Sequence, residues 1–268
     1  LDYATQPDPF RGFAGTPELI LPLAADLRTV RYADLFEVGS ILPEPLGLES
    51  VAVLLELSFG LSAWKSWGGD RWPLRCNPSS GNLHPTECSI AASGVPEIAD
   101  GVYHYACREH LLEQRCAVSF PFSGVLVGLS SIHWREAWKY GERAFRYCQH
   151  DIGHGLAALR YAAGVLGWQV RLLDDWSDRD VAALLGLDRS EAFAAAEQEV
   201  PDLVCAVGPE PDPTITPEPL LAALAAGQWY GQANVLSHHH RHHWPVIDEV
   251  LRATVQPRTV VPGPPPPS

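Results

Sequence analysis

Short polar side chains crowd a stiff stretch between two prolines, Pro78 and Pro85. Each proline fixes its own φ and favours extended geometry in the preceding residue, while Gly81 can adopt a positive φ or admit a ligand close to the backbone. The hydrogen-bonding residues between the prolines are Ser79, Ser80, Asn82 and His84. A planar ligand whose edge alternates donors and acceptors would suit them, because an asparagine amide offers both. The pyrimidine edge of a flavin is one such ligand. The simpler interpretation is a polar turn before a strand that starts near Glu87.

A cation and a phenol are adjacent at Lys139 and Tyr140. Oxidation of a C–N or C–C bond by a flavin removes a proton and delivers a hydride to the ring. A phenol beside a cation ionises more readily, so Tyr140 could take that proton. A cation near the reduced ring stabilises its negative charge, and Lys139 or Arg75 could supply it. Taken alone, the pair is more typical of an exposed helix surface.

Two histidines, His150 and His154, lie four residues apart around Asp151, which superficially suggests a helical zinc motif. An aspartate is shorter than the glutamate base of that motif, Gly153 weakens the helix, and no third ligand stands at a suitable spacing. We therefore predict no metal site. His154 is expected to pack near a flavin or to satisfy a core hydrogen bond. The histidine-rich segment 238–243 is interpreted as a solvated cluster without a function.

The stretch Pro-Ser-Ser-Gly-Asn-Leu-His-Pro-Thr-Glu, residues 78–87, resembles the signature loop of SagB-type dehydrogenases, a branch of the nitroreductase-like FMN enzymes. Other nitroreductases carry Pro-Ser-x-x-Asn-x-Gln-Pro, so His84 stands where they have glutamine. A second motif also resembles this branch: Lys139-Tyr140, an arginine-rich segment, and then Asp151-Ile152-Gly153-His154. The two motifs occur in the expected order, and the resemblance covers residues 48–208.

The resemblance implies that residues of the loop lie along the isoalloxazine ring of FMN and that Lys139 and Tyr140 are catalytic. The expected cofactor contacts in and around the loop are Arg75, Pro78, Ser79, Ser80, Asn82, His84 and His154. Nitroreductases usually bind the FMN phosphate through an early arginine-rich motif, which Arg28 and Arg31 resemble loosely. Two solvated arginines near a turn explain that pattern equally well.

Three functions follow as hypotheses. The leading one is a SagB-type dehydrogenase with FMN that acts on a small heterocyclic or peptide-derived substrate, azoline to azole being the known chemistry of the family. The second is a nitroreductase-like enzyme that uses NAD(P)H as a transient electron donor to reduce a nitro or quinone-type acceptor. The third is a non-catalytic half of a flavin site, because the opening residues 2–11 and the proline-rich end resemble the first unit of tandem SagB-type proteins.

The pattern of apolar and turn residues predicts strands followed by long helices, without βαβ alternation. The expected strands are 87–92, 101–106, 110–116, 168–172 and 202–208. The expected helices are 48–65, 134–167 with a break near Gly141 or Gly153, 177–185 and 217–226. Segment 120–131 is expected to be irregular.

This order favours an α+β domain with an antiparallel sheet. The resemblance implies a nitroreductase-like fold, with a central antiparallel-rich sheet flanked by helices and FMN at a dimer interface. We divide the chain into an extended N-terminal arm, residues 1–47, an FMN-binding domain, residues 48–255, and a proline-rich tail or linker, residues 256–268. The partner would be a second copy or a second similar domain.

The composition excludes several other classes of protein. The 268 residues are 46% hydrophobic and carry a formal net charge of −13, with no basic cluster, so nucleic acid is not an expected partner. No apolar run could span a bilayer and no targeting signal opens the chain, so we expect a cytoplasmic location and no membrane partner. The six cysteines lack paired spacing, which predicts reduced thiols.

Overall fold

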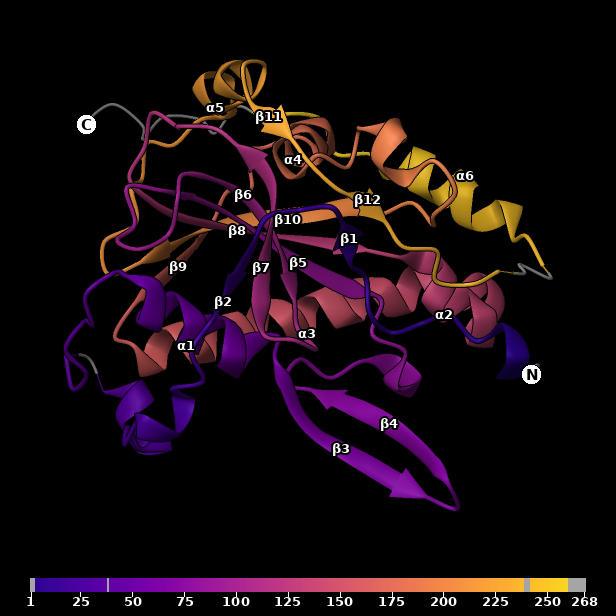
Figure 1. The fold of residues 1–268 in the computed structure, drawn as a ribbon, viewed down its shortest axis with the longest axis horizontal. Coiled ribbons are helices and arrows are strands. Elements are labelled where there is room, and N and C mark those ends of the chain that lie inside the picture. Colours follow the sequence, from indigo (N-terminus) through magenta and orange to yellow (C-terminus); the bar gives the residue numbers. More distant parts are fainter. Residues whose placement is uncertain (1–2, 38, 239–241, 260–268) are drawn as a thin grey trace, which may run out of the picture.

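The computed structural model describes residues 3–37, 39–238 and 242–259. A large antiparallel sheet forms its centre, in the strand order β11-β7-β6-β5-β8-β10-β9, with β2 also paired to β7 (Figure 1). The strands of this sheet are β2 (Glu18–Ile20), β5 (Thr86–Ser93), β6 (Gly101–Ala106), β7 (Leu111–Ala117), β8 (Gly124–Ser131), β9 (Gln169–Leu172), β10 (Val200–Gly208) and β11 (Gln228–Trp229). Strands β1 (Phe13–Ala14) and β12 (Gln232–Ala233) form a separate pair. The predicted α+β class with an antiparallel sheet is confirmed.

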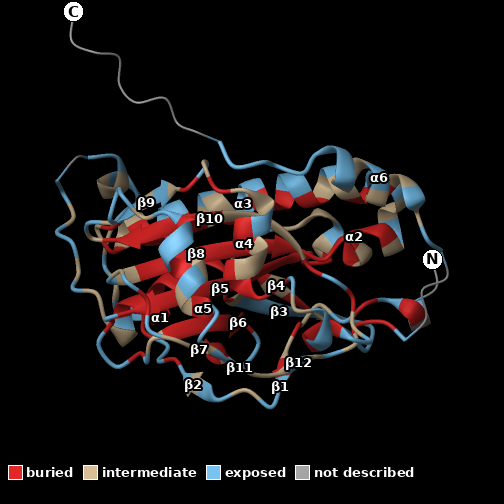
Figure 2. Ribbon diagram, turned by 90° about the horizontal axis from the view of Figure 1, so that it is seen from above, coloured by how far each residue is buried: buried red, intermediate tan, exposed pale blue. Residues whose placement is uncertain are grey.

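Helices cover both faces of the central sheet. The helices are α1 (Leu48–Ser58), α2 (His133–Tyr140), α3 (Ala144–Val165), α4 (Asp178–Leu185), α5 (Pro217–Leu224) and α6 (Pro245–Ala253). One core cluster joins α1 and α3 to one face of the sheet, and a second joins α4 and α5 to the other. Strands β5, β6 and β8 and the second half of β10 are buried between these layers (Figure 2).

Strand β8 corrects the prediction of an irregular segment at 120–131. Its side chains alternate between the two faces, because Val125, Val127 and Leu129 join one core cluster while Leu126 joins the other. Glycines and serines within the segment hid this period-two pattern. Gly128 is needed there, since a Cβ would lie 2.6 Å from a methyl group of Leu185.

The helical pattern after Leu48 ends earlier than predicted. Helix α1 stops at Ser58, and strands β3 (Leu61–Trp67) and β4 (Asp70–Arg75) follow as a separate two-stranded hairpin. Gly68 and Gly69, with φ of 58° and 96°, form its turn, as the commonest hairpin turn requires. The hairpin projects from the body of the molecule (Figure 1). Strand β3 is largely exposed and β4 is partly buried, and tryptophans occur in both, so apolar spacing alone did not separate them from a helix.

The long predicted helix breaks at Gly141, which adopts a φ of 59°, and not at Gly153, which lies within continuous α3. A Cβ on Gly141 would lie 3.1 Å from the ring of Trp244, just before α6. Helix α6 was not predicted, although Pro245 at its first turn and the apolar residues that follow are a recognisable helix start. The remaining predicted strands and helices are present, with ends shifted by one or two residues.

Candidate functional site

The glycine of the proline-bounded loop lies against the Lys-Tyr pair. A Cβ built on Gly81 would stand 2.5 Å from the hydroxyl of Tyr140 and 2.9 Å from Nζ of Lys139. The ammonium of Lys139 also lies 5.4 Å from the centre of the Tyr140 ring. The fold therefore brings together the two motifs that carry the predicted chemistry. A larger residue at this position would displace the ends of both side chains and would be strained at the φ of 62°.

The loop adopts a conformation that few sequences tolerate. Gly81, Asn82 and His84 have positive φ values of 62°, 60° and 52°. A non-glycine residue in this region costs on the order of 1 kcal/mol, and it persists where surrounding contacts impose it. Oγ of Ser79 accepts a hydrogen bond of 2.9 Å from the His84 N–H, and Nδ2 of Asn82 donates to the carbonyl of Pro73 at 2.8 Å. One N–H of the Asn82 amide is thus occupied, and its oxygen can accept from a ligand N–H.

The buried carboxylate of Asp151, on α3, is hydrogen-bonded to the backbone of the loop. Both oxygens of Asp151 accept from the Ser80 N–H, at 3.1 and 3.2 Å, and the residue has no exposed surface. Burial raises the pKa of Asp151 to about 6. Glu136 on α2 is also fully buried, and burial, followed by the charge of Asp151, raises its pKa to about 9. Sequence reasoning did not single out either residue for this role, although Asp151 stands in the second motif.

Beneath the loop lies a buried network of charges. Glu87 contacts the guanidinium of Arg135, lies 3.6 Å from Arg75 and lies 3.1 Å from Nε2 of His104. His104 also pairs through Nδ1 with Glu113, at 2.8 Å. Burial opposes protonation of His104, but its hydrogen bonds to the two carboxylates outweigh it and raise its pKa to about 9.

Arg75 and His84 belong to this network rather than to an open surface. Arg75 is 7% exposed and donates to the carbonyls of Thr86 and Pro9. His84 is 1% exposed, and burial and the charge of Arg75 lower its pKa to about 3, so its ring is neutral. In the structure the side chains of both residues are therefore buried beneath the loop and do not reach its exposed surface.

A cavity of about 420 Å³ opens beside Gly81 and Lys139. Its walls are the N-terminal segment, the end of β4, the loop and α2, with the aromatic residues Tyr3, Trp72 and Trp138 among them. Asn82 lines it as well. Aromatic and prolyl surfaces share its walls with polar groups, among them Gln6, Asn82 and the ammonium of Lys139. Such a site suits a flat ring that carries several polar atoms.

Three further predicted residues do not join this site. Arg28 pairs with Glu44 and Glu49, at 2.8 and 3.0 Å. Arg31 pairs with Asp34 at 2.7 Å. The chain around them packs against the far end of α3, where Gly164 meets Leu35, about 20 Å along the helix from Asp151.

His154 is the third of these residues. Its side chain is half-exposed, with Nδ1 3.6 Å from Asp151, so it does not fill the core.

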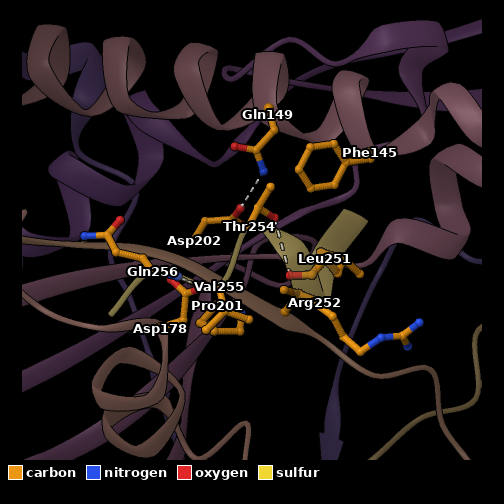
Figure 3. A pocket seen from close by; sticks show the side chains of 11 residues that line it. Phe145, Gln149, Asp178, Pro201, Asp202, Leu251, Arg252, Thr254, Val255 and Gln256 are labelled. Atoms are coloured by element: carbon orange, nitrogen blue, oxygen red, sulfur yellow. Dashed lines mark hydrogen bonds between the residues drawn. The ribbon is translucent and has the colours of Figure 1, made fainter. Parts of the chain in front are cut away.

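A second cavity lies between α3, the start of β10 and the segment after α6 (Figure 3). Asp202 stands in its wall and accepts a hydrogen bond of 3.3 Å from Gln149. Burial raises the pKa of Asp202 to about 7. None of the predicted site residues lines this cavity.

The described ranges contain no group of three or more histidine, cysteine, aspartate or glutamate residues arranged to hold a metal ion. Residues 239–241 of the histidine-rich segment lie outside those ranges. Within the same ranges, no helix combines the length and the apolar character that crossing a membrane requires.

No family model matches the chain. It is similar to a protein of Methanocaldococcus jannaschii that is named as a nitroreductase, with 21% identity over 188 residues, which cover 63% of this chain and 90% of that protein. A solved structure from Anabaena variabilis, also named as a nitroreductase, matches with a TM-score of 0.64 and 20% identity. That match covers 98% of this chain and 52% of the Anabaena chain, so this chain spans about half of its length.

The Escherichia coli microcin synthetase complex, solved with truncated pro-microcin bound, is also similar. The TM-score is 0.50 with 19% identity, and the match covers 72% of this chain and 75% of that chain. At these identities the comparisons establish the fold. The chain has the nitroreductase-like fold that the two sequence motifs predicted.

Proposed function

We propose that this chain is an FMN-dependent oxidoreductase. The observation that carries the proposal is the contact between the two motifs, in which Gly81 leaves space for the Tyr140 hydroxyl and the Lys139 ammonium. The nitroreductase-like fold and the aromatic cavity beside this contact support it.

The residues around the cavity fit the isoalloxazine ring of FMN. The oxygen of Asn82 can accept from a ring N–H, while one N–H of its NH₂ group donates to the carbonyl of Pro73. Pro78, Ser79 and Ser80 complete the proposed contacts. Arg75 and His84 support the loop from beneath. FMN, when bound, would supply the hydride acceptor.

The Lys139-Tyr140 pair would act on the substrate side of this chemistry. Tyr140 would take the proton that leaves the substrate, and Lys139 would stabilise negative charge beside the ring. We infer a SagB-type dehydrogenation of a small heterocyclic or peptide-derived substrate. The matching motif pair, residues 78–87 and 139–154, supports this assignment over a reductase that takes electrons from NAD(P)H, whereas the fold is compatible with both.

We further propose that the site is completed by a second copy of this chain. Arg28 and Arg31 are both neutralised by carboxylates, so the FMN phosphate needs a cation from elsewhere. The β3–β4 hairpin supports pairing, because an isolated two-stranded hairpin is marginally stable in water and this one exposes 82% of Trp67 and 38% of Trp64.

The first test is the absorbance spectrum of the purified chain, followed by mass spectrometry of any released cofactor. We expect flavin absorbance bands and the mass of FMN. We also expect NADPH to bleach the bound flavin slowly compared with a nitroreductase. A colourless protein that takes up no added FMN would overturn the oxidoreductase proposal and favour a non-catalytic half-site. Rapid bleaching by NADPH would favour the NAD(P)H-dependent reductase.

Pairing is tested separately by sedimentation velocity. We expect a dimer for the wild type and a shift toward monomer in Trp67→Ser. Leu42→Ser removes an equally exposed apolar side chain, 83% exposed, outside the hairpin and should not shift it. A wild-type chain that sediments as a monomer at all concentrations would overturn the second-copy proposal.

A further inference from the structure

Two carboxyl groups are buried directly behind the loop that carries Gly81. Asp151 on α3 and Glu136 on α2 both have no exposed surface. Asp151 accepts from the backbone N–H of Ser80 through both oxygens, at 3.1 and 3.2 Å. Among the described residues, neither oxygen of Glu136 has a hydrogen-bond partner. A buried carboxyl without a partner is costly, so this arrangement calls for a functional explanation.

The charges around the pair indicate how it is protonated. Nδ1 of His154, also on α3, lies 3.6 Å from Asp151. The positive charge of Lys139, on α2, favours the ionised form of Glu136 and so opposes the rise in its pKa. With the pKa of Glu136 raised to about 9 and that of Asp151 to about 6, the pair holds one proton and one negative charge at neutral pH. The negative charge is on Asp151, where the Ser80 N–H meets it.

The conformation of the loop explains what this charge does. Positive φ values at Gly81 and Asn82 must be imposed by contacts, since these backbone angles are unfavourable for Asn82. The Ser79–His84 and Asn82–Pro73 hydrogen bonds tie the loop to itself and to β4. The bond from Ser80 ties it to α3, which follows α2 and its Lys-Tyr pair. A hydrogen bond to an ionised acceptor is about twice as strong as a neutral one.

We propose that Asp151 is a positioning residue, whose carboxylate holds the Ser80 N–H and thereby fixes the Gly81 turn against Tyr140. This deepens the proposed function, because the turn is the surface offered to the flavin. The contact itself exists whether or not FMN binds, so it can be tested on the chain alone.

The direct test is hydrogen exchange of the Ser80 amide, measured by NMR without added FMN. Asp151→Ala should speed exchange at least tenfold relative to the wild type. Asp151→Asn keeps an acceptor oxygen and should restore much of the protection. Gly153→Ala, on the same helix with nothing within 4 Å of its new methyl group, is the matched control and should leave exchange unchanged.

A pH titration distinguishes positioning by charge from a merely structural contact. In the wild type the Ser80 amide shift should titrate with a midpoint near pH 6. Asp151→Asn should abolish that titration. Exchange within twofold of wild type in folded Asp151→Ala, or a wild-type amide shift that does not move between pH 5 and 7, would overturn the proposal. If Asp151→Ala does not fold, the titration and Asp151→Asn decide it.

The flavin readout separates this inference from the proposed function. If FMN binds, its dissociation constant should rise at least tenfold in Asp151→Ala and much less in Asp151→Asn, which keeps an acceptor oxygen. If the Ser80 amide loses its protection in Asp151→Ala but the wild type binds no FMN, the positioning role is supported and the cofactor is rejected. If the Ser80 amide stays protected in Asp151→Ala and the protein binds FMN, the cofactor is supported and the positioning role is rejected.

Discussion

The hydroxyl of Tyr140 occupies the space that a side chain at Gly81 would need. A Cβ there would lie 2.5 Å from the phenol oxygen, well inside van der Waals contact, and the φ of 62° at Gly81 would strain any larger residue. The loop and the Lys-Tyr pair lie far apart in the sequence. Their contact makes one site from two motifs, and the geometry at Gly81 offers a sharp test of it.

Gly81→Ala should disrupt the site twice over, through strain at positive φ and through collision with Tyr140. We expect at least a tenfold loss of flavin affinity and a loss of stability of about 1–2 kcal/mol. Fluorescence titration with FMN and thermal denaturation measure the two effects. Gly153→Ala, an exposed glycine within α3, should instead stabilise the chain by about 0.5–1 kcal/mol and leave FMN binding intact. Equal FMN affinity in both variants would contradict the role of Gly81.

Tyr140→Phe should abolish proton removal without loosening the flavin. General base catalysis contributes about 10²–10⁴-fold, so turnover of a synthetic azoline peptide should fall by at least 100-fold while the flavin spectrum stays unchanged. Tyr147→Phe is the matched control, because its ring lies 4.5 Å from that of Tyr140. Turnover that survives in Tyr140→Phe would exclude the phenol as the base.

His104 should make the fold lose stability in alkaline solution. Its pKa is raised to about 9 by Glu113 and Glu87, so its contribution is complete below pH 6.5 and is lost as the pH rises from 6.5 through about 9. Urea denaturation should show the free energy of unfolding falling across this window, by on the order of 2 kcal/mol. In His104→Gln that decline should become shallower, leaving the part that the raised pKa of Glu136 contributes over the same range. A wild-type profile that stays flat from pH 6.5 to 9 would contradict a charged His104.

Glu136→Gln should stabilise the chain, and increasingly so at higher pH. The pKa of Glu136 is raised from 4.5 to about 9, so the folded state favours the protonated acid and loses stability as the pH climbs between those values. Glutamine cannot ionise and avoids this loss, which we expect to amount to on the order of 2 kcal/mol at pH 8. Glu37→Gln, an exposed residue, serves as the control in the same denaturation series and should change little. A Glu136→Gln variant less stable than wild type at pH 8 would mean that Glu136 is ionised and paired.

Local chemistry explains which elements the sequence predicted well. The strands 87–92 and 101–106 carry β-favouring residues between clear turn residues, and Gly141 breaks a helix because its φ is positive. Strand β8 and the β3–β4 hairpin were missed because their regular structure depends on partners. Gly128 makes β8 look weak until Leu185 is seen to need its space. Glycine and serine weaken the local strand preference of β8, whereas the tryptophans and Gly68-Gly69 of the hairpin are strand and turn signals that the helical spacing after Leu48 obscured.

The sequence by itself determined the chemistry of the site: a stiff polar loop with one glycine, a cation beside a phenol, and an asparagine amide. These follow from residue type and spacing, which act over a few residues. Only the tertiary structure decided that the loop meets the Lys-Tyr pair, that Arg75 and His84 lie buried behind it, and that Arg28 and Arg31 pair elsewhere. Burial and charge pairing depend on what the rest of the chain packs against each side chain. The same is true of Asp151 and Glu136, whose raised pKa values arise from burial.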